Sequence, residues 1–378
     1  MQAPSYVDLF LDAGEKAFRD EVVAYVRETA AQRDPLQFFK ARDEQTKSIY
    51  KDLGARGWLS QCWPVAHGGQ GRSPAFEFIL WDELAYARAC RVAMGPGVVA
   101  KTLSRYGTDE QRARYLPEIA RSTLTFALGY SEPEAGSDLG GVRTRARREG
   151  DRYLITGEKR WTSDAHTSTH LWLLARTGKL EDRARGLSLF IVPLDTRGIE
   201  VRPIPLIDGH RINEVRLDEV EVAEDNRVGD ENAAWPIMRE VLAMERHLQV
   251  LPGRIRRDFE DLLAWARESG AIEDSEVRRR LADIGAGLTQ IEAMTVGLVH
   301  NVADGHESEL GAASAKLLGT LLLQRIARTP SELGYDDALV KGGIFEFLWR
   351  EVIHETLSGG SIEVMRTLIA RRALNLGA

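Results

Sequence analysis

Residues 129–141 read GYSEPEAGSDLGG, and this stretch decides the interpretation of the whole chain. Glycines and serines surround Pro133, whose ring fixes the local backbone. In such a loop, backbone N–H groups and hydroxyls can approach an anionic or aromatic ligand without obstruction by side chains. We therefore interpret residues 129–141 as a ligand-binding loop.

A second stretch follows at residues 157–163, which read GEKRWTS. The large flat ring of Trp161 is followed directly by the hydroxyls of Thr162 and Ser163. An aromatic face beside hydrogen-bonding hydroxyls suits a planar heterocycle that must be both stacked and polarised. Flavin fits that description.

Together the two stretches resemble the paired signatures of the acyl-CoA dehydrogenase family, and the resemblance extends from the first expected helix to the last residue. Two short motifs in the right order are much more specific than one. The alternative is a glycine-rich turn and an unrelated core tryptophan. The resemblance implies a helical domain, a β domain and a second helical domain, in that order.

Apolar periodicity independently predicts the same order. Residues 14–118 show helical spacing, for example at Phe18, Val22, Tyr25 and Val26. Helices are expected over Lys47–Gly57, Ala75–Ala87 and Asp109–Ile119, and strands over Tyr153–Thr156, His170–Ala175, Leu187–Pro193 and Asn213–Val222.

From Ala234 onward the helical spacing returns, and one face carries Val277, Leu281, Ile284, Leu288 and Ile291. We predict an α+β protein with three domains. These are an N-terminal helical domain (1–120), a middle antiparallel β-barrel or sheet domain (121–230) and a C-terminal four-helix bundle (231–378).

Composition excludes several classes of function. The net charge is −7, and Lys and Arg are spread along the chain, which argues against nucleic acid and anionic membranes as partners. The chain shows neither a run of 18 apolar residues nor a signal-peptide pattern at its start. Cys62 and Cys90 form no metal-like pair, and His166 and His170 fall where a loop leading into a strand is expected, so we predict a cytoplasmic protein without a metal.

The family resemblance implies FAD as the cofactor and assigns residues to it. Residues that match positions bordering the flavin are Tyr130, Ser131, Gly136, Ser137, Trp161, Thr162, Ser163, Ser361 and Glu363. Ser137, Arg246 and Gly360 match positions at the acyl-CoA substrate. Taken singly, Ser131 could cap a turn, Trp161 could fill a core, and Arg246 could form a surface ion pair.

The family's catalytic base, a glutamate, occurs at one of two places. One place is the C-terminal glycine-rich loop, where this chain has Gly359. The other lies in the first long helix after the β domain, where this chain has Glu245. The resemblance therefore implies Glu245 as the base that removes the α-proton; the alternative is a surface pair between Glu245 and an arginine.

The chain departs from the family at two sequences through which many relatives reach the FAD of a neighbouring subunit. Residues 267–280 and 331–343 lack them. The protein either binds FAD mainly through its own residues or is completed by a different subunit, as in paired bacterial enzymes of steroid side-chain breakdown. We expect a homo- or hetero-oligomer, such as a dimer of dimers.

The resemblance implies an acyl-CoA dehydrogenase that passes electrons to an electron-transfer flavoprotein. A bulky, branched or steroid-derived acyl group is the expected substrate. Two alternatives stay open: a FAD-poor or non-catalytic partner subunit of a heteromeric enzyme, and an oxygen-using flavin monooxygenase or oxidase on the same fold.

Overall fold

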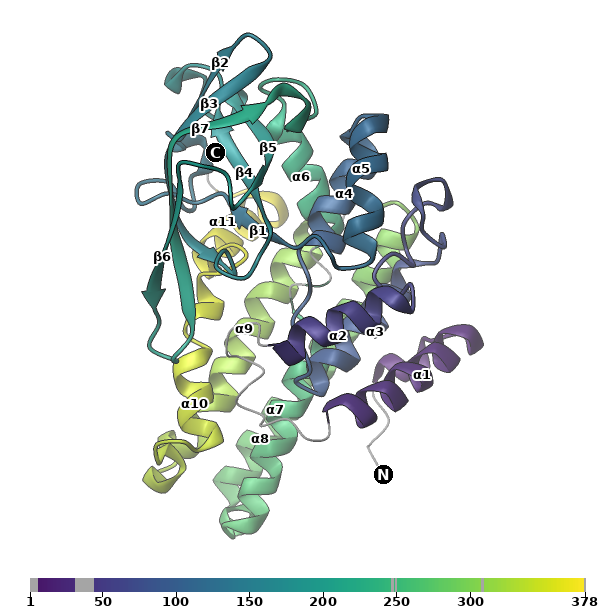
Figure 1. Ribbon diagram of the computed structural model, residues 1–378. Helices are drawn as coiled ribbons and strands as arrows, with labels where there is room; N and C mark the ends of the chain where they lie inside the picture. The colour runs from purple at the N-terminus through teal and green to yellow at the C-terminus, as the bar shows by residue number, and fades with distance from the viewer. Residues whose placement is uncertain (1–5, 31–43, 246–247, 249, 307–308, 377–378) are drawn as a thin grey trace. The chain divides into compact units, whose positions relative to one another are not determined.

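The computed structural model of the chain describes residues 6–30, 44–245, 248, 250–306 and 309–376 (Figure 1). The chain divides into two compact units. The sheet unit comprises Lys40–Arg72 and Val92–Glu245, and the helical unit comprises Met1–Phe39, Ser73–Arg91 and Arg246–Ala378. The domain limits after residues 120 and 230 stay predictions.

The sheet unit contains, within the described residues, an eight-stranded sheet in the order β6-β7-β3-β2-β4-β5-β8, with β1 beside β4. Neighbouring strands run antiparallel except that β1 and β2 each pair with β4 in parallel. The strands are β1 (Phe126–Gly129), β2 (Arg145–Glu149), β3 (Arg152–Ser163), β4 (His170–Arg176), β5 (Leu187–Pro193), β6 (Ile199–Pro205), β7 (Arg211–Ala223) and β8 (Arg227–Val228).

Strand β7 shows how the sequence pattern sets the register. Val215 and Leu217 are buried, as are Val220 and Val222, and the pattern slips by one residue at Asp218 and Glu219. There the β3–β7 pairing shifts, and Glu219 has a positive φ of 50°. The bulge restores the apolar side chains to the same face.

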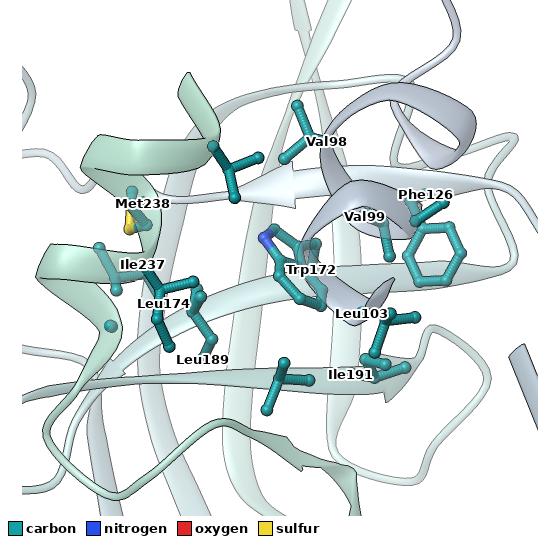
Figure 2. Close-up of a cluster of buried hydrophobic side chains, with 14 of the residues drawn as sticks. Val98, Val99, Leu103, Phe126, Trp172, Leu174, Leu189, Ile191, Ile237 and Met238 are labelled. Carbon is teal, nitrogen blue, oxygen red and sulfur yellow. The ribbon is translucent and has the colours of Figure 1, made fainter. Parts of the chain in front are cut away.

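The helices of the sheet unit complete its core. They are α2 (Glu44–Ala55), α4 (Ala100–Tyr106), α5 (Asp109–Ala120) and α6 (Ala234–Glu245). Figure 2 shows the indole of Trp172, on β4, between Val99 and Leu103 on one side and Ile237 and Met238 of α6 on the other. Trp172 is fully buried, and α4, α5 and α6 all contribute side chains to the apolar cluster around it on one face of the sheet.

The helical unit packs long helices around a second core. Its helices are α1 (Ala13–Ala30), α3 (Pro74–Tyr86), α7 (Pro252–Glu268), α8 (Ser275–Ala303), α9 (Glu309–Glu332), α10 (Ile344–Glu351) and α11 (Ile362–Ala373). The predicted apolar face from Val277 to Ile291 is buried in this core, and α8 packs against α7 and α9. Helix α3 also packs against α7 and α8, so a helix from the N-terminal part of the chain lies against the C-terminal helices.

Among the described residues, none of the helices combines the length and the apolar character needed to span a membrane.

Candidate flavin and substrate site

A buried ion pair joins the two motif stretches. Lys159 on β3 lies with its Nζ 2.7 Å from Oε1 of Glu132 and donates a second hydrogen bond, of 3.1 Å, to the carbonyl of Tyr130. The side chain of Lys159 is fully buried. A backbone hydrogen bond of 2.9 Å from the Arg160 N–H to the Ser131 carbonyl adds to this link. The structure therefore brings Tyr130 and Ser131 beside the strand that carries Trp161.

Glu132 also binds the backbone after the glycine-rich loop. Its carboxylate accepts hydrogen bonds from the N–H groups of Arg143, at 2.7 Å, and Thr144, at 2.9 Å. Burial alone would raise the pKa of Glu132, but the charge of Lys159 and these donors hold it below its usual value. Burial lowers the pKa of Lys159 to about 8 despite the charge of Glu132. At neutral pH both side chains are therefore ionised, and the ion pair links the two motif stretches inside the sheet unit.

Trp161 projects from an irregularity in β3. The β3–β7 register shifts between Lys159 and Thr162, and Trp161 has a φ of 59°, which a bulky side chain rarely adopts. The indole is 47% exposed, and the guanidinium carbon of Arg160 lies 5.9 Å from its ring centroid. Such local strain is typical of binding sites. It leaves a large aromatic face accessible.

Thr162 supplies a hydroxyl with no partner. Its side chain is 1% exposed, and among the described residues nothing hydrogen-bonds its Oγ1. Its carbonyl accepts a hydrogen bond of 2.9 Å from Nδ2 of Asn213 on β7, which holds this end of the strand in place. A buried hydroxyl without a partner costs free energy unless a ligand completes it.

The remaining predicted flavin residues of the sheet unit lie at its surface. Gly136, Ser137 and Ser163 are exposed, and a Cβ built on Gly136 would have no atom within 4 Å. An accessible indole, an unpaired hydroxyl and an open loop of small residues fit a planar aromatic cofactor with polar edges. The residues present thus fit a flavin.

The C-terminal glycine-rich loop belongs to the helical unit. Gly359 and Gly360 have φ values of 65° and 99°, and Ser361 caps α11 by accepting a hydrogen bond of 3.3 Å from the Val364 N–H. Glu363, in the first turn of α11, is exposed. The structure brings Gly360, Ser361 and Glu363 together, in a conformation that favours glycine at positions 359 and 360.

Sequence reasoning missed a buried charge cluster that precedes this loop. Nη1 of Arg254 lies 2.7 Å from Glu355, and Arg254 also pairs with Glu351. Lys316 lies 3.5 Å from Glu355 and Arg91 3.0 Å from Glu351. Burial would raise the pKa of Glu355, but Arg254 and Lys316 hold it well below its usual range.

Glu351, Glu355 and His354 place three possible ligand atoms within 4.8 Å of one another. Because both carboxylates already have cationic partners, we assign no metal here. The five ionic residues of this cluster come from separate segments of the chain between Arg91 and Glu355, so they leave no local sequence signal. The pairing of Glu132 with Lys159, in contrast, could have been suspected from opposite charges in the two motifs.

The predicted base is positioned by α6. Glu245 is the last residue of this helix, and its side chain lies outside the described part of the structure. Arg246, the predicted substrate contact, also lies outside the described residues. Both assignments therefore stay predictions from sequence.

Comparison with protein-family models matches almost the whole chain. The N-terminal domain model of the acyl-CoA dehydrogenases matches residues 12–123, the middle domain model residues 127–220 and the C-terminal domain model residues 232–374. The chain belongs to the acyl-CoA dehydrogenase family and is an oxidoreductase of that class. The predicted helical, β and helical order is confirmed.

Two curated relatives come from Mycobacterium tuberculosis. The chain is 35% identical to acyl-CoA dehydrogenase FadE26 over 354 residues, which covers 87% of this chain and 88% of that protein. It is 33% identical to acyl-CoA dehydrogenase IpdE1, with 88% of each covered.

Two solved structures are similar to this chain over nearly its whole length. The Tcur3481-Tcur3483 steroid ACAD has a TM-score of 0.90 and 33% identity, with 97% of this chain and 98% of that chain covered. The ChsE4-ChsE5 complex from Mycobacterium tuberculosis has a TM-score of 0.88 and 31% identity, with both chains fully covered.

Proposed function

We propose that this protein is a FAD-dependent enzyme that oxidises the Cα–Cβ bond of an acyl-CoA thioester. The observation that carries the proposal is the exposed indole of Trp161 beside the unpartnered hydroxyl of Thr162. Trp161 would flank the flavin ring, and Thr162 and Ser163 would hydrogen-bond its polar edge. Tyr130, Ser131, Gly136 and Ser137 would border it from the glycine-rich loop.

The reaction removes a proton from Cα and a hydride from Cβ and leaves a trans double bond. Bound FAD would supply the acceptor for the hydride and its two electrons. The proton would go to the carboxylate of Glu245, at the end of α6. The backbone N–H of Gly360 would stabilise negative charge on the thioester oxygen, while Arg246 would contact the CoA portion and Ser361 and Glu363 the cofactor.

Glu245 is the proposed base because the alternative position carries no acid. Gly359 stands where other family members have a glutamate, and its φ of 65° disfavours any residue with a side chain. A glutamate with a pKa near 4.3 is a weak base for a carbon acid. Binding of an apolar acyl chain would exclude water from Glu245 and raise its pKa toward neutrality.

The relatives support a bulky acyl group and a partner chain. One similar structure is a steroid ACAD with two named components, and another is a complex of two named chains. We propose a steroid-derived or branched acyl-CoA as the substrate, and an oligomer in which a second subunit completes the flavin site. An electron-transfer flavoprotein would accept the electrons.

An anaerobic titration with linear, branched and steroid-linked CoA thioesters tests the cofactor, the reaction and the substrate class together. The purified protein should be yellow, and a bulky thioester should bleach it. Colourless protein that gains FAD only with a second chain would show a partner-dependent site. Peroxide release during turnover in air would point to an oxygen-using enzyme instead.

Glu245→Gln should slow flavin reduction by about 10²–10⁴-fold, because general-base catalysis contributes that much. Glu240→Gln is the matched control, since Glu240 lies on the same helix and pairs with Arg105 at 2.6 Å. Near-full reduction rates in Glu245→Gln would reject the assignment. Equal losses in both variants would point to damage to α6 instead.

A further inference from the structure

Arg176, the last residue of β4, is buried and directs its whole guanidinium at main-chain carbonyls. Nε donates to the Val142 carbonyl at 2.7 Å, and Nη2 donates to the Gly140 carbonyl at 2.8 Å. Nη1 donates to the carbonyls of Lys179, at 2.8 Å, and Arg183, at 2.9 Å. One cation thereby joins the end of the glycine-rich loop to the segment of residues 179–183.

No carboxylate among the described residues forms an ion pair with Arg176. The planar guanidinium presents five N–H donors in a fixed arrangement, so it can hold several carbonyls in one geometry. A lysine could not reproduce that arrangement, because its charge sits on a single nitrogen. The contacts of Arg176 therefore fix backbone conformation.

Arg176 and Glu132 hold the same peptide group from its two sides. The carbonyl of Val142 accepts from Arg176 at 2.7 Å, and the next N–H along the chain, that of Arg143, donates to Glu132 at 2.7 Å. The C=O and N–H of a trans peptide point in opposite directions. The Val142–Arg143 peptide plane can thus rotate only if one charge-assisted hydrogen bond breaks.

This peptide follows the loop that carries the proposed flavin contacts. Gly140 and Val142 lie three and five residues after Ser137, and the loop is open to solvent at Gly136 and Ser137. Glu132 in turn is tied to Lys159, two residues before Trp161. The orientation of the Val142–Arg143 peptide therefore sets the path of the loop relative to the indole.

We propose that Arg176 is a positioning residue that prepares the loop of residues 136–141 for FAD. This inference rests on the proposed function. Arg176 touches no proposed cofactor contact itself and acts through the carbonyls of Gly140 and Val142. Without the guanidinium, the loop would sample other conformations and FAD binding would have to order it.

The test compares Arg176→Met and Arg176→Lys with a matched control, Gln111→Met. Gln111 is also buried in the sheet unit and also donates to two carbonyls, those of Asp225 at 2.7 Å and Arg227 at 2.8 Å. Its contacts lie at a different backbone segment. Apoprotein of each variant is titrated with FAD, and hydrogen exchange is measured at the amides of residues 137–144.

Arg176→Met should raise the FAD dissociation constant by at least about tenfold, as expected when an ordering cost is added to binding. Exchange should accelerate at the Arg143 amide, which Arg176 does not contact. Arg176→Lys should fall between Arg176→Met and the parent protein in both measurements. Gln111→Met should change FAD affinity by less than about twofold.

Coupling to Ser137 provides a second readout. If Arg176 acts through the loop, the effects of Arg176→Lys and Ser137→Ala on FAD affinity should not add, whereas those of Gln111→Met and Ser137→Ala should add. Should Arg176→Met fail to fold, Arg176→Lys carries the same comparison.

An unchanged FAD affinity and unchanged Arg143 exchange in the Arg176 variants would overturn the inference, as would equal losses in Gln111→Met. A parent protein that binds no FAD would contradict the proposed function instead. Because the exchange measurement needs no cofactor, it still tests the positioning role in that case.

Discussion

The sheet unit and the helical unit both bury charged side chains, but they use them differently. In the sheet unit, Glu132 binds two backbone N–H groups and Arg176 binds four carbonyls. In the helical unit, several buried charges bind one another across helices: Arg254 of α7 pairs with Glu351 of α10, and Arg256 of α7 pairs with Glu292 of α8.

The difference separates two tasks of buried charge. A charge that binds peptide groups fixes the conformation of an irregular segment, which hydrophobic packing alone determines poorly. A charge that binds another side chain holds two regular elements together. We expect removal of a buried charge in the sheet unit to affect both folding and cofactor binding, and removal of a buried ion-pair partner in the helical unit to affect folding alone.

The largest expected effect follows from Glu132→Gln. This change leaves Lys159 buried without a counter-charge, so it should lower the free energy of unfolding by about 3–5 kcal/mol. Urea denaturation measures the loss. Glu132→Gln combined with Lys159→Met should recover part of it, because the uncompensated cation is gone. A double variant that is less stable than Glu132→Gln would contradict this explanation.

Arg256→Met should destabilise the protein by about 3 kcal/mol, because buried Glu292 then loses its ion pair with Arg256. The same denaturation experiment applies. If the comparison between the units is right, this variant keeps the parent protein's FAD content at temperatures where it is folded. Loss of FAD from folded Arg256→Met would contradict the claim that buried ion pairs of the helical unit affect folding alone.

Asp82, in the helical unit, should make the stability of the protein depend on pH. Burial raises the pKa of Asp82 to about 7, although Arg256 and the Gly253 N–H oppose the shift. Between about pH 4 and pH 7 the folded state keeps a proton that the unfolded state has released. The contribution of Asp82 to stability should therefore fall as pH rises, by up to about 1.4 kcal/mol per pH unit.

Asp82→Asn should remove this slope, because the amide does not titrate and can still accept the hydrogen bond of 2.7 Å from the Gly253 N–H. Denaturation of both proteins at several pH values makes the comparison. An identical slope in the two proteins would show that Asp82 is already ionised in the folded state.

The smallest expected effect concerns Thr162→Val. The substitution removes an unpartnered buried hydroxyl while keeping the shape of the side chain, so stability should stay the same or rise slightly. FAD affinity should fall about two- to tenfold if the hydroxyl binds the cofactor. Thr320→Val removes another unpartnered buried hydroxyl, in α9, and should leave FAD affinity unchanged. Equal FAD affinity in the Thr162→Val and Thr320→Val variants would show that the Thr162 hydroxyl does not bind the cofactor.

The sequence predicted the order of domains and the apolar face of α8, because the regular spacing of apolar residues can be recognised without knowledge of tertiary contacts. It did not predict β2, because four of its five residues are charged and only Ala146 of the strand is buried. Strand β6 was missed for a related reason, since two prolines interrupt its alternation.

The candidate site also contains features that the sequence predicts and features that it does not. The motifs pointed to Trp161 and Thr162, but the positive φ of Trp161 and the missing partner of the Thr162 hydroxyl emerge only in three dimensions. Arg176 lies more than thirty residues from the carbonyls of Gly140 and Val142 along the chain. No local pattern marks such a contact. The role of Glu245 stays a prediction from sequence.

The most direct test of the account is an equilibrium FAD titration of two apoprotein variants, Glu132→Gln and Arg256→Met, under conditions where both are folded. The account predicts that Glu132→Gln weakens FAD binding at least about tenfold, while Arg256→Met stays within about twofold of the parent protein. Equal weakening in the two variants would contradict the claim that the charges bound to backbone in the sheet unit organise the flavin site.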